Sequence, residues 1–161
     1  MFYKQFLKII DVLDESFVEK FDFWIATLPE RLARTISVSA VASRFEVKYS
    51  AANAIMTFAE KEGILKKRYV VICDNEECQF FYEDFDADEL VNKIGEEVYC
   101  HNCSREFKIS YENILVVYGK VKEPNIPEDK LEEEIMKRME LLEETGNYEN
   151  FSFADSLGKN I

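Results

Sequence analysis

The sequence is poor in the residue patterns that most catalytic sites require. Its 161 residues include one histidine, His101, and the sequence contains neither a glycine-rich phosphate loop nor a nucleophile elbow. No set of nucleophile and base can be assembled from these patterns. We therefore expect a protein that is not an enzyme and that takes no small-molecule substrate.

Long apolar runs are also missing. Hydrophobic residues make up 47% of the chain, yet no run approaches the roughly 18–20 residues of a membrane span. The N-terminus does not have the basic segment and unbroken apolar stretch of a signal peptide. We expect a cytoplasmic protein with a packed core and no membrane contact, in a compartment where thiols stay reduced.

Negative charge dominates, but it is unevenly distributed. The net charge is −12, and residues 73–110 alone carry eleven acidic against three basic side chains. Residues 48–72 are the exception, with five basic and two acidic side chains. Because phosphates are attracted by local positive charge, only this segment is suited to contact nucleic acid.

Four cysteines have the spacing of a metal site. Cys73 and Cys78 form a C-x4-C pair, and after 21 residues Cys100 and Cys103 form a C-x2-C pair. Two tight turns of this kind bring four thiolates to one tetrahedral ion, and four cysteines are a usual ligand set for structural Zn²⁺. The sequence therefore predicts one bound Zn²⁺. The alternatives are two disulfides or four free thiols in the core, but no feature indicates the oxidising compartment that disulfides require.

The segments around the cysteines predict a zinc ribbon over residues 73–121. Strand-like stretches at 69–72, 79–82, 97–99 and 104–110 lead into and out of the two pairs. Between the pairs, Asp86 is a candidate N-cap of an inserted helix whose apolar side is Leu90, Val91 and Ile94. Residues 113–121 predict a last strand that is buried on both faces.

The first 16 residues predict an N-terminal amphipathic helix. Over residues 2–13, the apolar side chains recur at helical spacing: Phe2, Phe6, Ile9, Ile10 and Leu13. Such a helix either packs on the chain's own core or forms a dimer contact.

Residues 17–72 predict three helices and a closing strand. A helix at 17–28 ends at Pro29, a second starts at Ser39, and a third covers 51–62 with Ser50 as its cap. The third helix is expected to bury Ala54, Ile55, Phe58 and Ala59. This order, with the segments 37–47 and 50–58 and the Glu-Gly-Ile-Leu sequence at 62–65, resembles a winged helix-turn-helix domain.

The resemblance implies a DNA-contacting surface. In winged helices the third helix is the recognition helix and the following strands carry the wing. The corresponding candidate residues here are Lys48, Tyr49, Asn53, Thr57 and Lys61 on the helix, with Lys66, Lys67 and Arg68 as the wing. The helix has no arginine, although arginine to guanine is the commonest specific contact, and the alternative is a winged helix that binds protein.

Residues 122–161 predict a linker, an acidic helix at 128–145 and a tail. The helix has a narrow apolar seam formed by Leu131, Ile135, Met139 and Leu142. An isolated helix of this length is only marginally stable in water. The seam therefore either packs on the rest of the chain or pairs with another protein, and we expect it to bind a partner.

Taken together, the chain is predicted to be an α+β protein: a winged helix domain, a zinc ribbon and a C-terminal helix. This order of modules resembles the alpha subunit of transcription factor E and bacterial winged-helix and zinc-ribbon accessory proteins. The resemblance implies a non-catalytic adaptor or regulatory subunit that bridges protein partners, within a multi-gene system as one expected setting. A DNA-binding transcriptional regulator that uses residues 48–68 is the alternative, and a homodimer is the lesser option for the partner.

Overall fold

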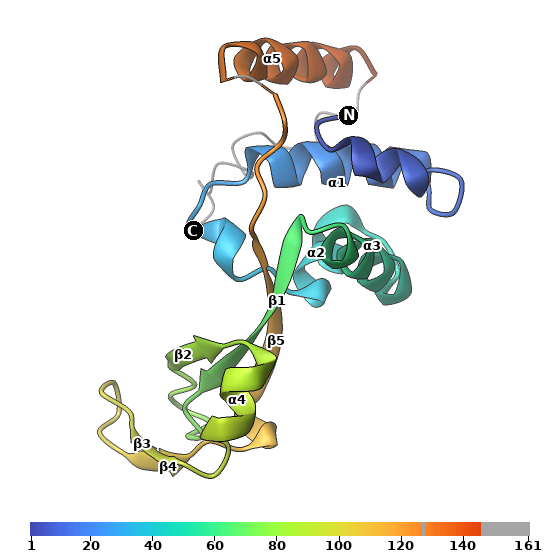
Figure 1. The fold of residues 1–161 in the computed structure, drawn as a ribbon. Coiled ribbons are helices and arrows are strands. Elements are labelled where there is room, and N and C mark those ends of the chain that lie inside the picture. Colours follow the sequence, from blue (N-terminus) through green and yellow to red (C-terminus); the bar gives the residue numbers. More distant parts are fainter. Residues whose placement is uncertain (127, 146–161) are drawn as a thin grey trace.

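The chain has a mixed α+β architecture, with most helices gathered at one end and the short strands, together with one short helix, at the other (Figure 1). The computed structural model describes residues 1–126 and 128–145. Two long antiparallel strands, β1 (Leu65–Ile72) and β5 (Ile114–Lys120), run between the two ends. The predicted α+β class is confirmed, whereas the predicted tail after residue 145 lies outside the described residues.

Helix α1 (Glu15–Thr27) forms where the sequence predicts a helix. The Asp14 side chain accepts a hydrogen bond from the Phe17 backbone N–H and caps its first turn. Leu28 is extended before Pro29, as a residue before proline prefers, and the helix ends there. Most residues of α1 are buried, on every side of the helix near Phe21. The helix therefore crosses the interior of the protein and does not lie on the protein's surface.

The N-terminal segment is wrongly predicted as a long helix. A short 3-10 helix, η1 (Lys4–Lys8), replaces it, followed by turns. Its conformation is set by long-range contacts: the buried Asp22 carboxylate of α1 accepts hydrogen bonds from the backbone N–H groups of Phe2 (2.8 Å) and Tyr3 (2.7 Å). Phe2 and Phe6 are buried in the chain's own core, which leaves little of this face for a dimer.

Helices α2 (Val38–Phe45) and α3 (Tyr49–Lys61) begin earlier than predicted, after the short 3-10 helix η2 (Leu32–Arg34). Ser37, not Ser39, caps α2, because its side chain accepts from the Ala40 backbone N–H. Lys48, not Ser50, is the N-cap position of α3. Ala54 is exposed, since the buried stripe of α3 runs through Ala52, Ile55, Met56 and Ala59.

These helices enclose the larger of two apolar clusters, here called the N-terminal cluster. Aromatic rings from η1, α1 and α2 meet in it: Phe21 lies 5.7 Å from Phe6 and 5.9 Å from Trp24, measured between ring centroids. Leu65 of β1 and Tyr118 of β5 join it from the sheet. The two long strands are therefore part of the same core as the helices.

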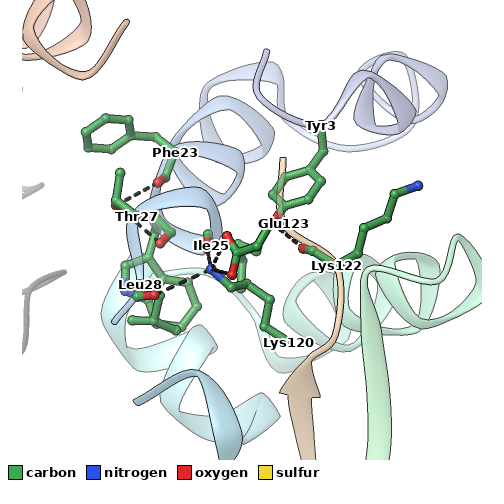
Figure 2. Close-up of polar contacts among 9 residues, drawn as sticks. Tyr3, Phe23, Ile25, Thr27, Leu28, Lys120, Lys122 and Glu123 are labelled. Atoms are coloured by element: carbon green, nitrogen blue, oxygen red, sulfur yellow. Dashed lines mark hydrogen bonds and ion pairs between the residues drawn. The ribbon is translucent and has the colours of Figure 1, made fainter. Parts of the chain in front are cut away.

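Polar contacts, most of them partly buried, attach β5 and the segment after it to α1 and to the N-terminal segment (Figure 2). The Lys120 ammonium donates to the backbone carbonyls of Ile25 (3.2 Å) and Leu28 (3.5 Å) at the C-terminal end of α1, and it pairs with Glu123 (3.1 Å). A cation there satisfies carbonyls that lack a helical partner and complements the helix dipole. The Tyr3 hydroxyl donates to the Lys122 carbonyl (2.7 Å).

The three-stranded sheet has the order β2-β1-β5, with β2 spanning Phe81–Phe85. β1 starts at Leu65, so Lys66, Lys67 and Arg68 lie in a regular strand opposite Gly119, Tyr118 and Val117, not in a loop-like wing. β5 is also less buried than predicted. Leu115 is 52% exposed and Val116 47% exposed.

The second apolar cluster, here called the ribbon cluster, lies at the other end of the strand pair. It combines Phe85 of β2, Leu90 of α4 (Ala87–Lys93), and residues of the hairpin β3 (Glu97–Tyr99) and β4 (Glu106–Lys108) with Cys73 and Cys100. Asp86 caps α4 as predicted, by accepting from the Glu89 backbone N–H. Val91 is 71% exposed, however, since α4 contacts the sheet mainly through Leu90.

Helix α5 (Glu128–Thr145) has the predicted bounds and lies near η1 and α1 (Figure 1). Leu131, Ile135 and Met139 are half-buried and pack against the N-terminal cluster. None of the helices within the described residues is both long enough and apolar enough to cross a membrane.

Candidate metal centre

The four cysteines predicted as metal ligands come together at the end of the sheet. Their sulfur atoms all lie within 4.8 Å of one another. Two of the distances join the two turns: Cys73 to Cys103 at 3.6 Å and Cys78 to Cys100 at 3.8 Å. A tetrahedral ion with metal–sulfur bonds of about 2.3 Å requires sulfur atoms about 3.8 Å apart. The cluster has the dimensions of a four-thiolate metal site, and it can hold a metal ion.

The two cysteine turns share a backbone geometry despite their different lengths. In each, the N–H of the first cysteine donates to the carbonyl two residues after the second: Cys73 to Phe80 and Cys100 to Arg105, both 2.9 Å. The residue directly after the second cysteine, Gln79 or Ser104, has a positive φ in each turn. The two turns therefore present their sulfur atoms in equivalent ways.

The two extra residues of the first turn are accommodated before its tight part. Gln79 N–H donates to Asn75 O (2.9 Å), whereas in the second turn Ser104 N–H donates to Cys100 O (2.8 Å). Asn75 thus takes the place that the first cysteine has in the shorter turn. Its side chain also accepts from the Glu77 backbone N–H (3.2 Å) and stiffens the longer loop.

The thiols of this cluster differ in their electrostatic surroundings. Asn102 in the second turn donates from its side-chain amide to Cys78 Sγ across the site (3.2 Å). This hydrogen bond is the main cause that lowers the pKa of the Cys78 thiol to about 7. Burial, in contrast, raises the pKa of Cys73, which is 1% exposed. A divalent cation would favour the thiolate form at both positions.

Asn113, which the sequence does not single out, holds the metal end of the sheet together. Its buried side-chain amide donates to the carbonyls of Ile72 (3.0 Å) and Lys108 (3.4 Å), and its oxygen accepts from the Ser110 backbone N–H (2.8 Å). Ile72 precedes Cys73, so this contact fixes the strand that presents the first ligand. Nothing in the local pattern around Asn113, in the short 3-10 helix η3 (Tyr111–Asn113), indicates this role.

His101 is not part of the sulfur cluster. It is exposed, and its ring meets that of Tyr99 edge-on, with the centroids 5.0 Å apart. Among the described residues, the four cysteines form the one group of histidine, cysteine and carboxylate side chains that can hold a metal ion.

The residues predicted to contact nucleic acid fall into two groups. Five are exposed at the start and along one side of α3, namely Lys48, Tyr49, Asn53, Thr57 and Lys61. Tyr49 and Asn53 line a surface groove together with Lys67 of β1. The strand residues are less available: Lys67 Nζ lies 3.8 Å from a Glu60 oxygen, and Arg68 donates to Asp84 (2.8 Å). Lys66 is exposed.

The residues predicted to bind a partner through the C-terminal helix are partly engaged within the chain. Leu131, Ile135 and Met139 contact the N-terminal cluster, while the side chain of Leu142 lies outside the described residues. Met136, next to the seam, is 60% exposed. Partner binding by this helix stays a prediction.

Comparisons of the chain with models of protein families, with curated proteins and with solved structures give no match.

Proposed function

We propose that the chain is a non-enzymatic, zinc-binding subunit of the winged-helix and zinc-ribbon type, which acts as an adaptor or regulator between protein partners. The observation that carries the proposal is the cluster of four cysteine sulfur atoms at tetrahedral spacing. Four thiolates fill the coordination shell of Zn²⁺ and leave no open position for a substrate, which is the pattern of structural sites. Sulfur ligands in this geometry favour Zn²⁺ over harder cations.

The proposed winged helix is supported by the order α1, α2, α3 and β1, with β5 returning beside β1. The proposed ribbon is supported by two equivalent cysteine turns at the ends of antiparallel strands. The strand pair shared by both ends fits a subunit whose metal end extends away from its helical end.

DNA binding is the second candidate, and the exposed polar side of α3 favours it. Two observations weigh against it. Lys67 and Arg68 already face carboxylates, and the chain as a whole carries a net charge of −12, which repels a phosphate backbone.

Purification of the tagged full-length chain from its native cells tests the two candidates. We expect one Zn²⁺ per chain by native mass spectrometry and a stoichiometric protein partner that remains after nuclease treatment. The matched variant replaces Lys66, Lys67 and Arg68 by alanine and should recover the same partner. The adaptor proposal is wrong if recovery needs nucleic acid, or if genomic fragments bind at low salt and lose affinity uniformly in the triple variant.

A further inference from the structure

The free edge of β5 is a second candidate binding site of the molecule. Tyr118 exchanges two backbone hydrogen bonds with Ile36 across this edge, Ile36 N–H to Tyr118 O (2.8 Å) and Tyr118 N–H to Ile36 O (2.7 Å). The edge therefore already accepts one residue of extended backbone from its own chain. Ser37 then caps α2, and the chain turns away from the edge.

The next outward-facing position on this edge is Val116. Backbone groups of a strand alternate in direction, so the N–H and C=O of Val116 point to the same side as those of Tyr118. On its other side, β5 pairs with β1 in a register that places Val116 opposite Tyr69 and Tyr118 opposite Lys67. Within residues 1–126 and 128–145, no backbone group pairs with Val116 on the outer side. An unpaired strand edge of this kind is a template for another strand.

A groove of about 510 Å³ runs beside this edge. Its second wall is formed by the starts of α2 and α3, through Ser37, Ser39, Tyr49 and Asn53, and its floor includes Val116 and Tyr118. The side chains of Val116 and of its neighbour Leu115 are about half exposed. Exposed apolar flanks beside free backbone groups suit a peptide strand better than a nucleic acid, which offers no matching backbone donors and acceptors.

The charge of the groove indicates what this strand should carry. Lys67 is the one side chain with a full charge at neutral pH among the residues that line the groove, and no carboxylate lines it, although the chain is strongly acidic. The Lys67 ammonium lies 5.7 Å from the centroid of the Tyr118 ring and 3.8 Å from a Glu60 oxygen, which is a loose ion pair between partly exposed side chains. Because such a pair contributes little free energy, it can be exchanged for a pair with a ligand. A carboxylate side chain of the ligand can pair with it.

We propose that the β5 edge and this groove bind an extended strand of a partner protein that carries a carboxylate opposite Lys67. The strand pairs with Val116 and lies in line with Ile36 along the same edge of β5. This inference rests on the proposed adaptor function and names the surface through which a partner is held.

Random heptapeptides displayed on phage, selected on the full-length metal-bound protein, test the proposal. We expect enriched peptides with β-branched or aromatic residues at alternate positions and an Asp or Glu at one fixed position. Val116→Pro removes the outward N–H without taking a donor from the β1 pairing, and proline is tolerated at strand edges. It should reduce affinity at least tenfold, whereas Val116→Thr, which keeps the N–H, should retain affinity within about twofold.

The charge-reversal variant Lys67→Glu remains informative even if the proline variant fails to fold. It should change the selected peptides from acidic to basic, and the matched variant Lys66→Glu, on the neighbouring residue of the opposite sheet face, should leave the acidic selection unchanged. The proposal is overturned if no peptide is enriched, if Val116→Pro binds the peptides like the parent, or if Lys67→Glu does not alter the selection.

Two other occupants of the edge give different results. A dimer in sedimentation analysis that Val116→Pro dissociates would assign the edge to a second copy. Tighter peptide binding by a chain ending at Thr145 would assign it to residues 146–161. Either result overturns the proposal that a partner protein supplies the strand. If the native partner is recovered equally well with Val116→Pro, the proposed adaptor function stands and the proposed binding surface is wrong. If no protein partner is recovered by any variant, the proposed adaptor function itself is wrong.

Discussion

Among the described residues, 22 buried side chains form the N-terminal cluster, whereas eight form the ribbon cluster, and two of those eight are cysteines. The first cluster has enough apolar surface to fold by hydrophobic burial. The second resembles the small domains that need a metal or disulfides to be stable. The same chain therefore contains two regions with different sources of stability, joined by the β1–β5 strand pair.

Metal removal should separate the two regions most clearly. If the cysteine cluster holds Zn²⁺ as proposed, chelation removes metal–ligand bonds that supply about 10 kcal/mol in small zinc domains. We then expect residues 73–113 to unfold and become sensitive to proteases. Trp24 is the only tryptophan and is buried in the N-terminal cluster, so its fluorescence should not change.

The cysteine variants provide the matched control for chelation. Cys103→Ser should reproduce the protease sensitivity, and His101→Ala should not, because His101 lies outside the sulfur cluster. A loss of Trp24 fluorescence on chelation would show that the two regions unfold together, contrary to the expectation that each has its own source of stability.

The opposite result is expected when the N-terminal cluster is damaged. Phe21 is fully buried among Phe6, Phe17, Trp24 and Phe45. Phe21→Ala should lower the free energy of unfolding by about 3–5 kcal/mol, measured as the urea midpoint of Trp24 emission. Leu7→Ala, at a residue 54% exposed, should change it by less than about 0.5 kcal/mol. Loss of the bound metal in the Phe21→Ala protein would contradict the expectation that the N-terminal cluster and the ribbon cluster are stabilised independently.

A smaller effect is expected where the strand pair meets α1. Lys120→Met removes the donor to the Ile25 and Leu28 carbonyls and should cost about 1–2 kcal/mol of unfolding free energy. The control is Lys122→Met, because Lys122 is exposed and contributes its backbone carbonyl, not its ammonium, to the Tyr3 contact (Figure 2). Equal thermal midpoints of the two variants would refute a capping role for Lys120.

The smallest effect concerns pH. Burial, with the nearby charges of Glu123 and Asp22, raises the pKa of the Tyr3 hydroxyl above its ordinary value of 10.0. The folded protein keeps this proton at a pH where the unfolded chain releases it, so the stabilisation is complete below about pH 10 and is lost as the pH rises further, by about 1.4 kcal/mol per pH unit. Tyr3→Phe should flatten this decline in urea unfolding between pH 10 and 11; an unchanged slope would argue against it.

Several features follow from local sequence signals. The spacing of four cysteines predicts the sulfur cluster, because each pair is closed by its own turn. Asp86 before an acidic and apolar segment predicts α4, and the helical repeat of residues 128–145 predicts α5. In these cases neighbouring residues supply the pattern, although the two cysteine turns and the face of α5 find their contacts with distant parts of the chain.

Other features depend on residues that are distant in the sequence. The sequence of residues 2–13 has a helical apolar repeat, but Asp22 accepts the backbone N–H groups of Phe2 and Tyr3 and fixes a different conformation. The sequence predicts a strand only from residue 69, yet pairing with β5, more than 40 residues away, extends it to include Lys66, Lys67 and Arg68. Local composition cannot report such pairings.

The sequence by itself determined which four cysteines come together and the positions of the main helices, since cysteine spacing and apolar periodicity act over a few residues. Only the tertiary structure decided that β1 and β5 join both clusters, that Lys120 caps α1, and that Val116 lies at an open edge beside Lys67. The physical reason is that these depend on which segments meet in space, and the free energy of that choice comes from burying the whole core at once.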